Sequence, residues 1–135
     1  GDIETIKRFS NEGSDLIIHA HGNNINKIKK HVPQFSEVMG TTQIKPLPLI
    51  RNFGGFTDGD RAVFLSEELG AKKAVLGGMD FGKKIGKYSK PALKQPKKAS
   101  KIKQMKLKIA KYLIQMIKKR GKMKNIKFLN EWKPP

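Results

Sequence analysis

The sequence predicts an α/β fold, a three-layer Rossmann-like arrangement with a mainly parallel sheet and helices on both faces. Two observations predict this class. Helical and strand patterns alternate along the 135 residues, and each polar or glycine-rich motif lies beyond the carboxyl end of an expected strand. Ligands of such sheets bind beyond the carboxyl ends of the strands. The length suits one domain, so we expect residues 1–135 to form a single α/β domain.

The first half of the chain shows two helix–strand pairs. Apolar residues recur at threefold spacing over 2–12, which predicts a helix. The mostly apolar run 15–20 is typical of a strand buried in a parallel sheet. A second helix is expected within 23–33, because asparagine caps its start and proline ends it. A strand near 39–44 then leads into a proline-rich connection.

The second half begins with a helix over 58–69, which Gly70 ends, and a strand over 73–76. Residues 82–98 contain glycine, lysine and proline without periodicity, so we expect a mobile loop there.

A long basic helix is expected over 99–121, with Ser100 as its cap and Gly121 as its end. Its inward stripe is expected to consist of Ile102, Met105, Ile109, Leu113 and Met116 or Ile117. A last strand is expected over 126–129.

The charge of the chain is concentrated in its last third. The formal net charge is +18, and residues 1–82 are neutral because ten basic and ten acidic residues balance there. Three interpretations stay open for the basic third: a solvated lysine-rich face, a positive field that gathers polyphosphate substrates, and a nucleic-acid surface. The last is the least favoured, because the aromatic residues are widely spaced at Tyr88, Tyr112, Phe128 and Trp132.

Composition excludes some chemistry. The chain has no cysteine, which excludes disulfides, zinc–thiolate sites and thiol nucleophiles. No apolar run reaches the length of a membrane span and no signal peptide is recognised, so we expect a cytoplasmic protein without a membrane partner. The lysine and isoleucine bias fits a thermophile.

Asp58-Gly59-Asp60-Arg61 is the strongest local cluster. The two carboxylates suit a hard cation such as Mg²⁺, and an arginine beside them can neutralise phosphate charge. The structural alternative is an N-cap Asp58, a first-turn Asp60 and a surface Arg61. Both interpretations stay open from the residues alone.

Several other polar or glycine residues are candidates for nucleotide or substrate binding. His19 and His21 lie on one face of the first strand by alternation, and turn glycines allow close approach to a phosphate. The full set of candidates is His19, His21, Asn23, Asn24, Thr42, Gln43, Asn52, Gly54, Gly55, Thr57, Asp80 and Lys83.

Taken in order, the motifs at 19–24, 41–43, 52–62 and 78–82 resemble the archaeal 6-hydroxymethyl-7,8-dihydropterin pyrophosphokinase family. That family is similar in fold to thiamin pyrophosphokinase. The resemblance implies Mg²⁺-dependent transfer of a pyrophosphoryl unit from ATP to the hydroxymethyl oxygen of a reduced pterin, with release of AMP.

The resemblance also implies residue roles. It places the 19–24 loop with Asp58 and Asp60 at the metal–polyphosphate end. Arg61 and the lysines at 83 and 84 become candidates for contact with phosphate oxygens.

Two departures from the family pattern matter. Position 23 is Asn, where the family usually has Asp, and the upstream Thr-Asp-Leu-Asp-Gly strand of the family is not in this sequence. We therefore expect the C-terminal portion of a longer catalytic domain, with slow or no turnover by itself. The alternative is a non-catalytic ligand-binding or nucleic-acid-binding relative. An open sheet edge would also permit a homo-oligomer.

Overall fold

The computed structural model describes residues 3–79, 81–82, 84–85 and 97–129. The chain divides into two compact units, Gly1–Phe53 and Gly54–Pro135, and each is described by itself. The helices and parallel strands of both units confirm the predicted α/β class. The three-layer arrangement with helices on both faces and the single domain over residues 1–135 stay predictions.

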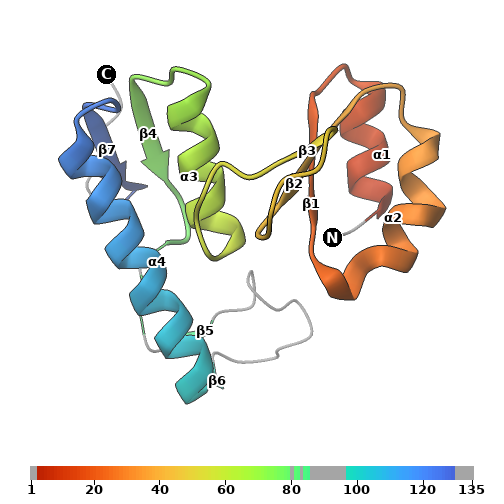
Figure 1. The fold of residues 1–135 in the computed structure, drawn as a ribbon. Coiled ribbons are helices and arrows are strands. Elements are labelled where there is room, and N and C mark those ends of the chain that lie inside the picture. Colours follow the sequence, from red (N-terminus) through yellow and green to blue (C-terminus); the bar gives the residue numbers. More distant parts are fainter. Residues whose placement is uncertain (1–2, 80, 83, 86–96, 130–135) are drawn as a thin grey trace. The chain divides into compact units, whose positions relative to one another are not determined.

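The first unit is a three-stranded parallel sheet with two helices, seen beside its strands in Figure 1. Its strands run in the order β1-β2-β3, and β1 pairs with β2 from Leu16 opposite Val38 to Ala20 opposite Thr42. The elements are α1 (Ile3–Asn11), β1 (Leu16–Ala20), α2 (Ile25–His31), β2 (Val38–Thr42) and β3 (Ile50–Arg51).

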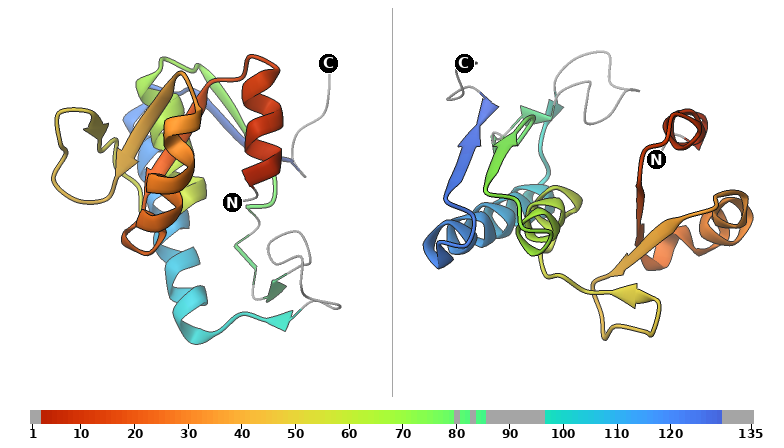
Figure 2. Two further views of the ribbon diagram at one scale, coloured as in Figure 1. Left: turned by 90° about the vertical axis from the view of Figure 1, so that its right-hand side faces the viewer. Right: turned by 90° about the horizontal axis from the view of Figure 1, so that it is seen from above.

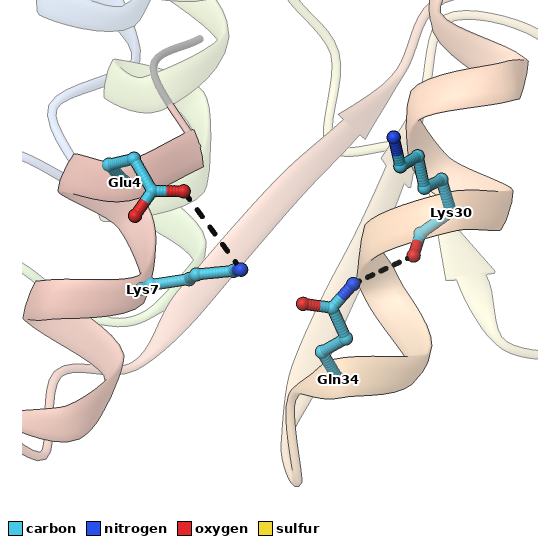
Figure 3. Close-up of polar contacts among 4 residues, drawn as sticks. All are labelled: Glu4, Lys7, Lys30 and Gln34. Carbon is cyan, nitrogen blue, oxygen red and sulfur yellow. Dashed lines mark hydrogen bonds and ion pairs between the residues drawn. The ribbon is translucent and has the colours of Figure 1, made fainter.

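Each helix of this unit has a local polar contact on its surface (Figure 3). On α1, the Nζ atom of Lys7 lies 3.9 Å from a carboxylate oxygen of Glu4. Beyond α2, Gln34 donates from Nε2 to the carbonyl of Lys30 at 2.9 Å. This bond satisfies one of the carbonyls that a helix end leaves without an intrahelical partner.

The second unit pairs two parallel strands and packs two helices on one face of the pair, as the views in Figure 2 show. Its elements are α3 (Asp58–Glu68), β4 (Lys73–Leu76), α4 (Lys101–Arg120) and β7 (Asn125–Phe128), with a short antiparallel pair β5 (Lys84–Ile85) and β6 (Lys97–Lys98). The β4–β7 pair runs from Lys73 opposite Asn125 to Leu76 opposite Phe128.

The long helix begins and ends where the sequence predicts. Ser100 caps α4 by accepting a hydrogen bond from the backbone N–H of Lys103 at 3.2 Å. Gly121 ends it in the left-handed conformation, at φ 74°. These two residues fix the ends of α4 because an N-cap acceptor and a left-handed glycine satisfy terminal backbone groups.

The apolar core lies in the second unit. All the buried hydrophobic residues among those described belong to it, and they are Val63, Phe64, Leu65, Leu76, Ala99, Ala110, Ile114, Ile117, Met123 and Ile126. Among the described residues of the first unit, Thr41 and Thr42 are the buried ones, while Ile17 and Met39 are paired across the sheet and exposed.

Two predictions about residues 82–121 were wrong in detail. Ile102 and Met105 were expected in the inward stripe of α4, yet they are 73% and 60% exposed. The helix instead buries Ala110, Ile114 and Ile117, a stripe that lies about 100° around the helix from the predicted one. Ile109, Leu113 and Met116 are therefore only half-buried. The ends of the predicted loop 82–98 form the β5–β6 pair, because backbone pairing needs no side-chain periodicity, and most of the remainder lies outside the described residues.

Every helix in the described part of the chain is either too short or too polar to span a membrane.

The fold predicts different effects for two isoleucines of α4. Ile114→Ala should lower the free energy of unfolding by about 2–5 kcal/mol, because it opens a cavity in the core. Ile102→Ala should change it by less than about 0.5 kcal/mol, since its side chain is exposed. Urea unfolding of both variants checks this, and equal losses would contradict the assigned core.

Candidate functional site

The carboxyl ends of β1, β2 and β3 bring polar residues to one edge of the first sheet. Parallel strands end at the same edge, so residues after Ala20, Thr42 and Arg51 lie near one another. Six predicted residues follow or end these strands here: His21, Asn23, Asn24, Thr42, Gln43 and Asn52.

His19 is held on β1 by the neighbouring strand. Its Nδ1 atom lies 3.1 Å from the carbonyl oxygen of Thr41 and 3.2 Å from the Thr41 hydroxyl. Because a carbonyl only accepts, the bond to it requires a proton on Nδ1. The His19 and His21 rings meet edge to face with centroids 5.7 Å apart, which confirms that they share a face.

Asn24 shapes the loop after β1. Its Nδ2 donates to the carbonyl of His19 at 2.8 Å, and its Oδ1 accepts from the backbone N–H of His21 at 2.9 Å. Both ends of the amide are therefore used to fold the 19–24 motif back on itself. Asn23 is exposed in the same 3₁₀ turn, Gly22–Asn24.

Thr42, at the end of β2, and Asn52, directly after β3, secure the loop that follows β2. The Thr42 hydroxyl accepts from the N–H of Ile44 at 3.3 Å, and Asn52 Nδ2 donates to the Ile44 carbonyl at 3.1 Å. Gln43 lies exposed between them. The structure thus places Thr42 and Asn52 as supports of the loop that presents Gln43.

In the second unit, Asp60 organises the turn that leads into α3. Its side chain is fully buried, at 0% exposure. One carboxylate oxygen accepts from the N–H of Phe56 at 2.5 Å, and the other accepts from the N–H of Thr57 at 2.8 Å and from the Thr57 hydroxyl. This is a capping box with Asp60 at the third helical position.

Asp58 has a different environment two residues earlier. It is exposed in the first turn of α3, where the helix dipole favours negative charge. The described residues contain no group of three or more His, Asp or Glu that could hold a metal. The role of both aspartates as metal ligands stays a prediction, and the geometry favours Asp58 over Asp60.

The two glycines before the capping box have backbone conformations that other residues rarely adopt, with φ 98° at Gly54 and 84° at Gly55. A Cβ at Gly55 would lie 2.7 Å from the Cα of Arg61, and one at Gly54 would lie 2.9 Å from the Phe64 ring. Both positions therefore require glycine, because the turn packs directly on α3.

Arg61 lies behind this turn. Its side chain is buried, at 7% exposure for the residue, and NH1 donates to the carbonyl of Gly55 at 3.4 Å. Burial lowers the pKa of the guanidinium, while the carboxylates of Asp60 and Asp58 oppose that change. The group stays charged at physiological pH. Of the structural alternative, the first-turn Asp60 is confirmed, whereas the N-cap Asp58 and the surface Arg61 are wrong, because Thr57 is the N-cap and Arg61 is buried.

Two predicted residues, Asp80 and Lys83, lie outside the described residues. Thr41 was missing from the set predicted to bind a ligand, although it holds His19 through two contacts. Its partner is set by strand register, His19 opposite Thr41. Nothing in the local sequence of either strand specifies that register.

Comparison with known proteins relates the chain to pterin enzymes. The family model described as 6-hydroxymethylpterin diphosphokinase MptE-like matches residues 2–86. A Pyrococcus furiosus protein named 6-hydroxymethyl-7,8-dihydropterin pyrophosphokinase is 49% identical over 113 residues, which cover 84% of this chain and 48% of that protein.

Two further relatives carry the same name. The Methanocaldococcus jannaschii protein is 49% identical over 124 residues, covering 87% of this chain and 52% of the relative. The Methanothermobacter thermautotrophicus protein is 42% identical over 122 residues, covering 90% and 53%. The chain thus spans about half the length of these curated relatives. No solved structure matches it.

The buried bonds of Asp60 predict a large loss of stability on substitution. Asp60→Asn should lower the free energy of unfolding by about 1–3 kcal/mol, because an amide nitrogen cannot accept from a buried N–H. Asp58→Asn removes the same charge from an exposed position and should cost no more than about 1 kcal/mol. Urea unfolding compares them, and a greater loss for Asp58→Asn would contradict this assignment.

Alanine substitutions at two glycines separate the cost of a left-handed backbone conformation from the cost of a steric clash. Gly70 has φ 82° and open space around a Cβ, whereas Gly55 has φ 84° and the backbone of Arg61 in the way. Gly70→Ala should cost about 1–2 kcal/mol for its backbone conformation alone. Gly55→Ala should lower the free energy of unfolding clearly more than Gly70→Ala does. Thermal unfolding of both variants measures this, and equal losses would show that the packing against Arg61 is absent in solution.

Proposed function

The chain belongs to the 6-hydroxymethylpterin diphosphokinase MptE-like family, and from this premise we propose that it serves transfer of a pyrophosphoryl unit from ATP to 6-hydroxymethyl-7,8-dihydropterin. The observation that carries the proposal is the similarity to three archaeal proteins named for this pterin, which spans 84–90% of the chain. The glycine turn and capping box at 54–60 and the polar edge of the first sheet lie inside the matched residues.

In the proposed reaction, the hydroxymethyl oxygen of the pterin bonds to the β-phosphorus of ATP. The bond from that phosphorus to the oxygen bridging the α- and β-phosphates breaks, and AMP leaves with that oxygen. The hydroxyl proton is released to solvent. Such transfers depend mostly on positioning and charge neutralisation rather than on covalent work by the protein.

The turn at residues 54–57 suits the binding of a polyphosphate. Its glycines bring backbone close to the start of α3, and the first N–H groups of a helix point toward an anion at that end. Because Asp60 consumes the N–H groups of Phe56 and Thr57, we assign phosphate contacts to the N–H groups of Asp58 and Gly59. The charged Arg61 behind the turn adds a fixed positive potential.

A magnesium ion fits this arrangement through a single carboxylate. Mg²⁺ is usually held by one or two carboxylates together with substrate phosphates and water. Asp58 is exposed at the start of α3, so it would hold the ion against the phosphates. When bound, the ion neutralises charge on the polyphosphate.

The polar edge of the first sheet suits the recognition of a substrate. Asn24, Thr42 and Asn52 fix two loops through backbone contacts. Gln43 and His21, both exposed, are then presented by rigid supports. We assign them to hydrogen bonding with the nucleotide or the pterin.

A second candidate function is ligand binding without catalysis. Asn23 favours it, because this exposed position lacks the carboxylate that the family usually has. Turnover and binding separate the two functions. The purified chain is mixed with ATP, Mg²⁺ and the reduced pterin, and chromatography measures AMP and the pterin diphosphate.

Equal amounts of both products, formed only when the pterin is present, support transfer. Calorimetric binding of ATP with Mg²⁺ and no product supports the binding role. If the chain neither binds ATP nor forms product, both candidate functions are overturned.

The proposed role of Asp58 as a magnesium ligand predicts a loss of ATP affinity when its carboxylate is removed. Asp58→Asn should weaken the affinity for ATP in the presence of Mg²⁺ by about tenfold or more, because a metal-holding carboxylate is removed. Glu68→Gln removes the same charge from the other, exposed end of α3 and serves as the control. Titration calorimetry compares the two variants, and equal affinities would rule out Asp58 as a ligand.

A further inference from the structure

The segment from Lys98 to Leu129 presents only positive charge to solvent. It contains no Asp or Glu, and all twelve of its Lys and Arg residues are exposed. They are Lys98, Lys101, Lys103, Lys106, Lys108, Lys111, Lys118, Lys119, Arg120, Lys122, Lys124 and Lys127. Eight of these belong to α4 itself, so the helix is the centre of the positive surface.

One side of α4 gathers these charges. Ala110, Ile114 and Ile117 are buried and define its inner side. At 3.6 residues per turn, the opposite side carries the exposed Gln115 and a set of four lysines with one methionine and one tyrosine. We call this set the outer face of α4, and it consists of Lys101, Met105, Lys108, Lys111, Tyr112 and Lys119.

The lysines of the outer face lack compensating charge within the described part of the chain. The ion pair that involves α4 joins Arg120 to Glu67 at 3.7 Å, away from this face. No described carboxylate pairs with the four outer-face lysines. Like charges on one helix repel and cost stability, so an anionic partner would relieve an existing repulsion.

Tyr112 adds an aromatic ring to this basic face. It is 63% exposed and lies four residues after Lys108 and seven before Lys119, which places all three on the same side of the helix. An exposed ring between lysines is the combination that proteins use to bind single-stranded nucleic acid, where bases stack on aromatic rings and phosphates meet basic side chains.

The charge decides among possible partners. A second copy of this chain would bring two +18 molecules together and would bury like charges against each other. A neutral apolar partner would desolvate the lysines without pairing them. A polyanion pairs with them and gains from counterion release.

We propose that the outer face of α4 binds single-stranded nucleic acid, with its lysines on the phosphates and a base stacked on Tyr112. This binding is independent of the pyrophosphoryl transfer proposed above, since it uses none of the residues at 19–24, 41–43 or 52–61. The wide spacing of aromatic residues in the sequence counted against such binding. One exposed ring among four lysines is nevertheless enough for a short contact site.

The test measures fluorescence anisotropy of a labelled oligouridine with the purified chain at increasing salt. The triple variant Lys101→Glu, Lys111→Glu, Lys119→Glu should bind more weakly and lower the slope of log affinity against log salt by about 2, because three phosphate contacts at about 0.7 each are lost. Tyr112→Ala should weaken binding by about tenfold.

The control variant makes the same change of net charge in the other unit. Lys27, Lys29 and Lys30 are exposed on α2, and their triple replacement by Glu changes the net charge equally. This control should keep most of the salt slope. An equal loss in the control would overturn the proposal, since only net charge would matter.

Tyr112→Ala binding like the unmodified chain would overturn the stacking contact. Binding to phosphatidylserine vesicles without binding to oligouridine would overturn the choice of partner. Circular dichroism of each variant confirms that its helices are intact before the affinities are compared.

Discussion

The buried carboxylate of Asp60 is the interaction on which the candidate site in the second unit depends. It accepts three hydrogen bonds from the two residues that precede α3, and it does so at 0% exposure. Charged acceptors make stronger hydrogen bonds than neutral ones, particularly away from water. The turn after Gly55 and the first turn of α3 are therefore fixed by the same side chain.

The hydrogen bonds of Asp60 give the residues of the Asp58–Arg61 motif different environments. Asp60 is occupied by the backbone, so Asp58 is the carboxylate that solvent and ligands can reach. Arg61 is held against the carbonyl of Gly55 and contributes its charge from behind the turn. Two aspartates with the same chemistry thus have separate roles because one faces inward and the other faces water.

In the first unit, hydrogen bonds rather than a deep apolar core fix the positions of the candidate residues. Its buried described residues are threonines, and its loops are tied by Asn24, Thr42 and Asn52. Strand register supplies the rest, because His19 meets Thr41 only when β1 and β2 pair as they do. The apolar core of the second unit, by contrast, fixes α3 and α4 on one face of their strands.

The sequence by itself determined the α/β class, the ends of α4 and the candidate motifs, because caps, glycines and periodicity act over a few neighbouring residues. It left open whether Asp58 and Asp60 bind metal or cap a helix, since both roles are compatible with two aspartates at this spacing. Only the tertiary structure decided that Asp60 is enclosed, that Arg61 is buried and that Ile102 and Met105 face solvent. Those outcomes depend on which surfaces meet in three dimensions, and local spacing carries no information about the packing partner.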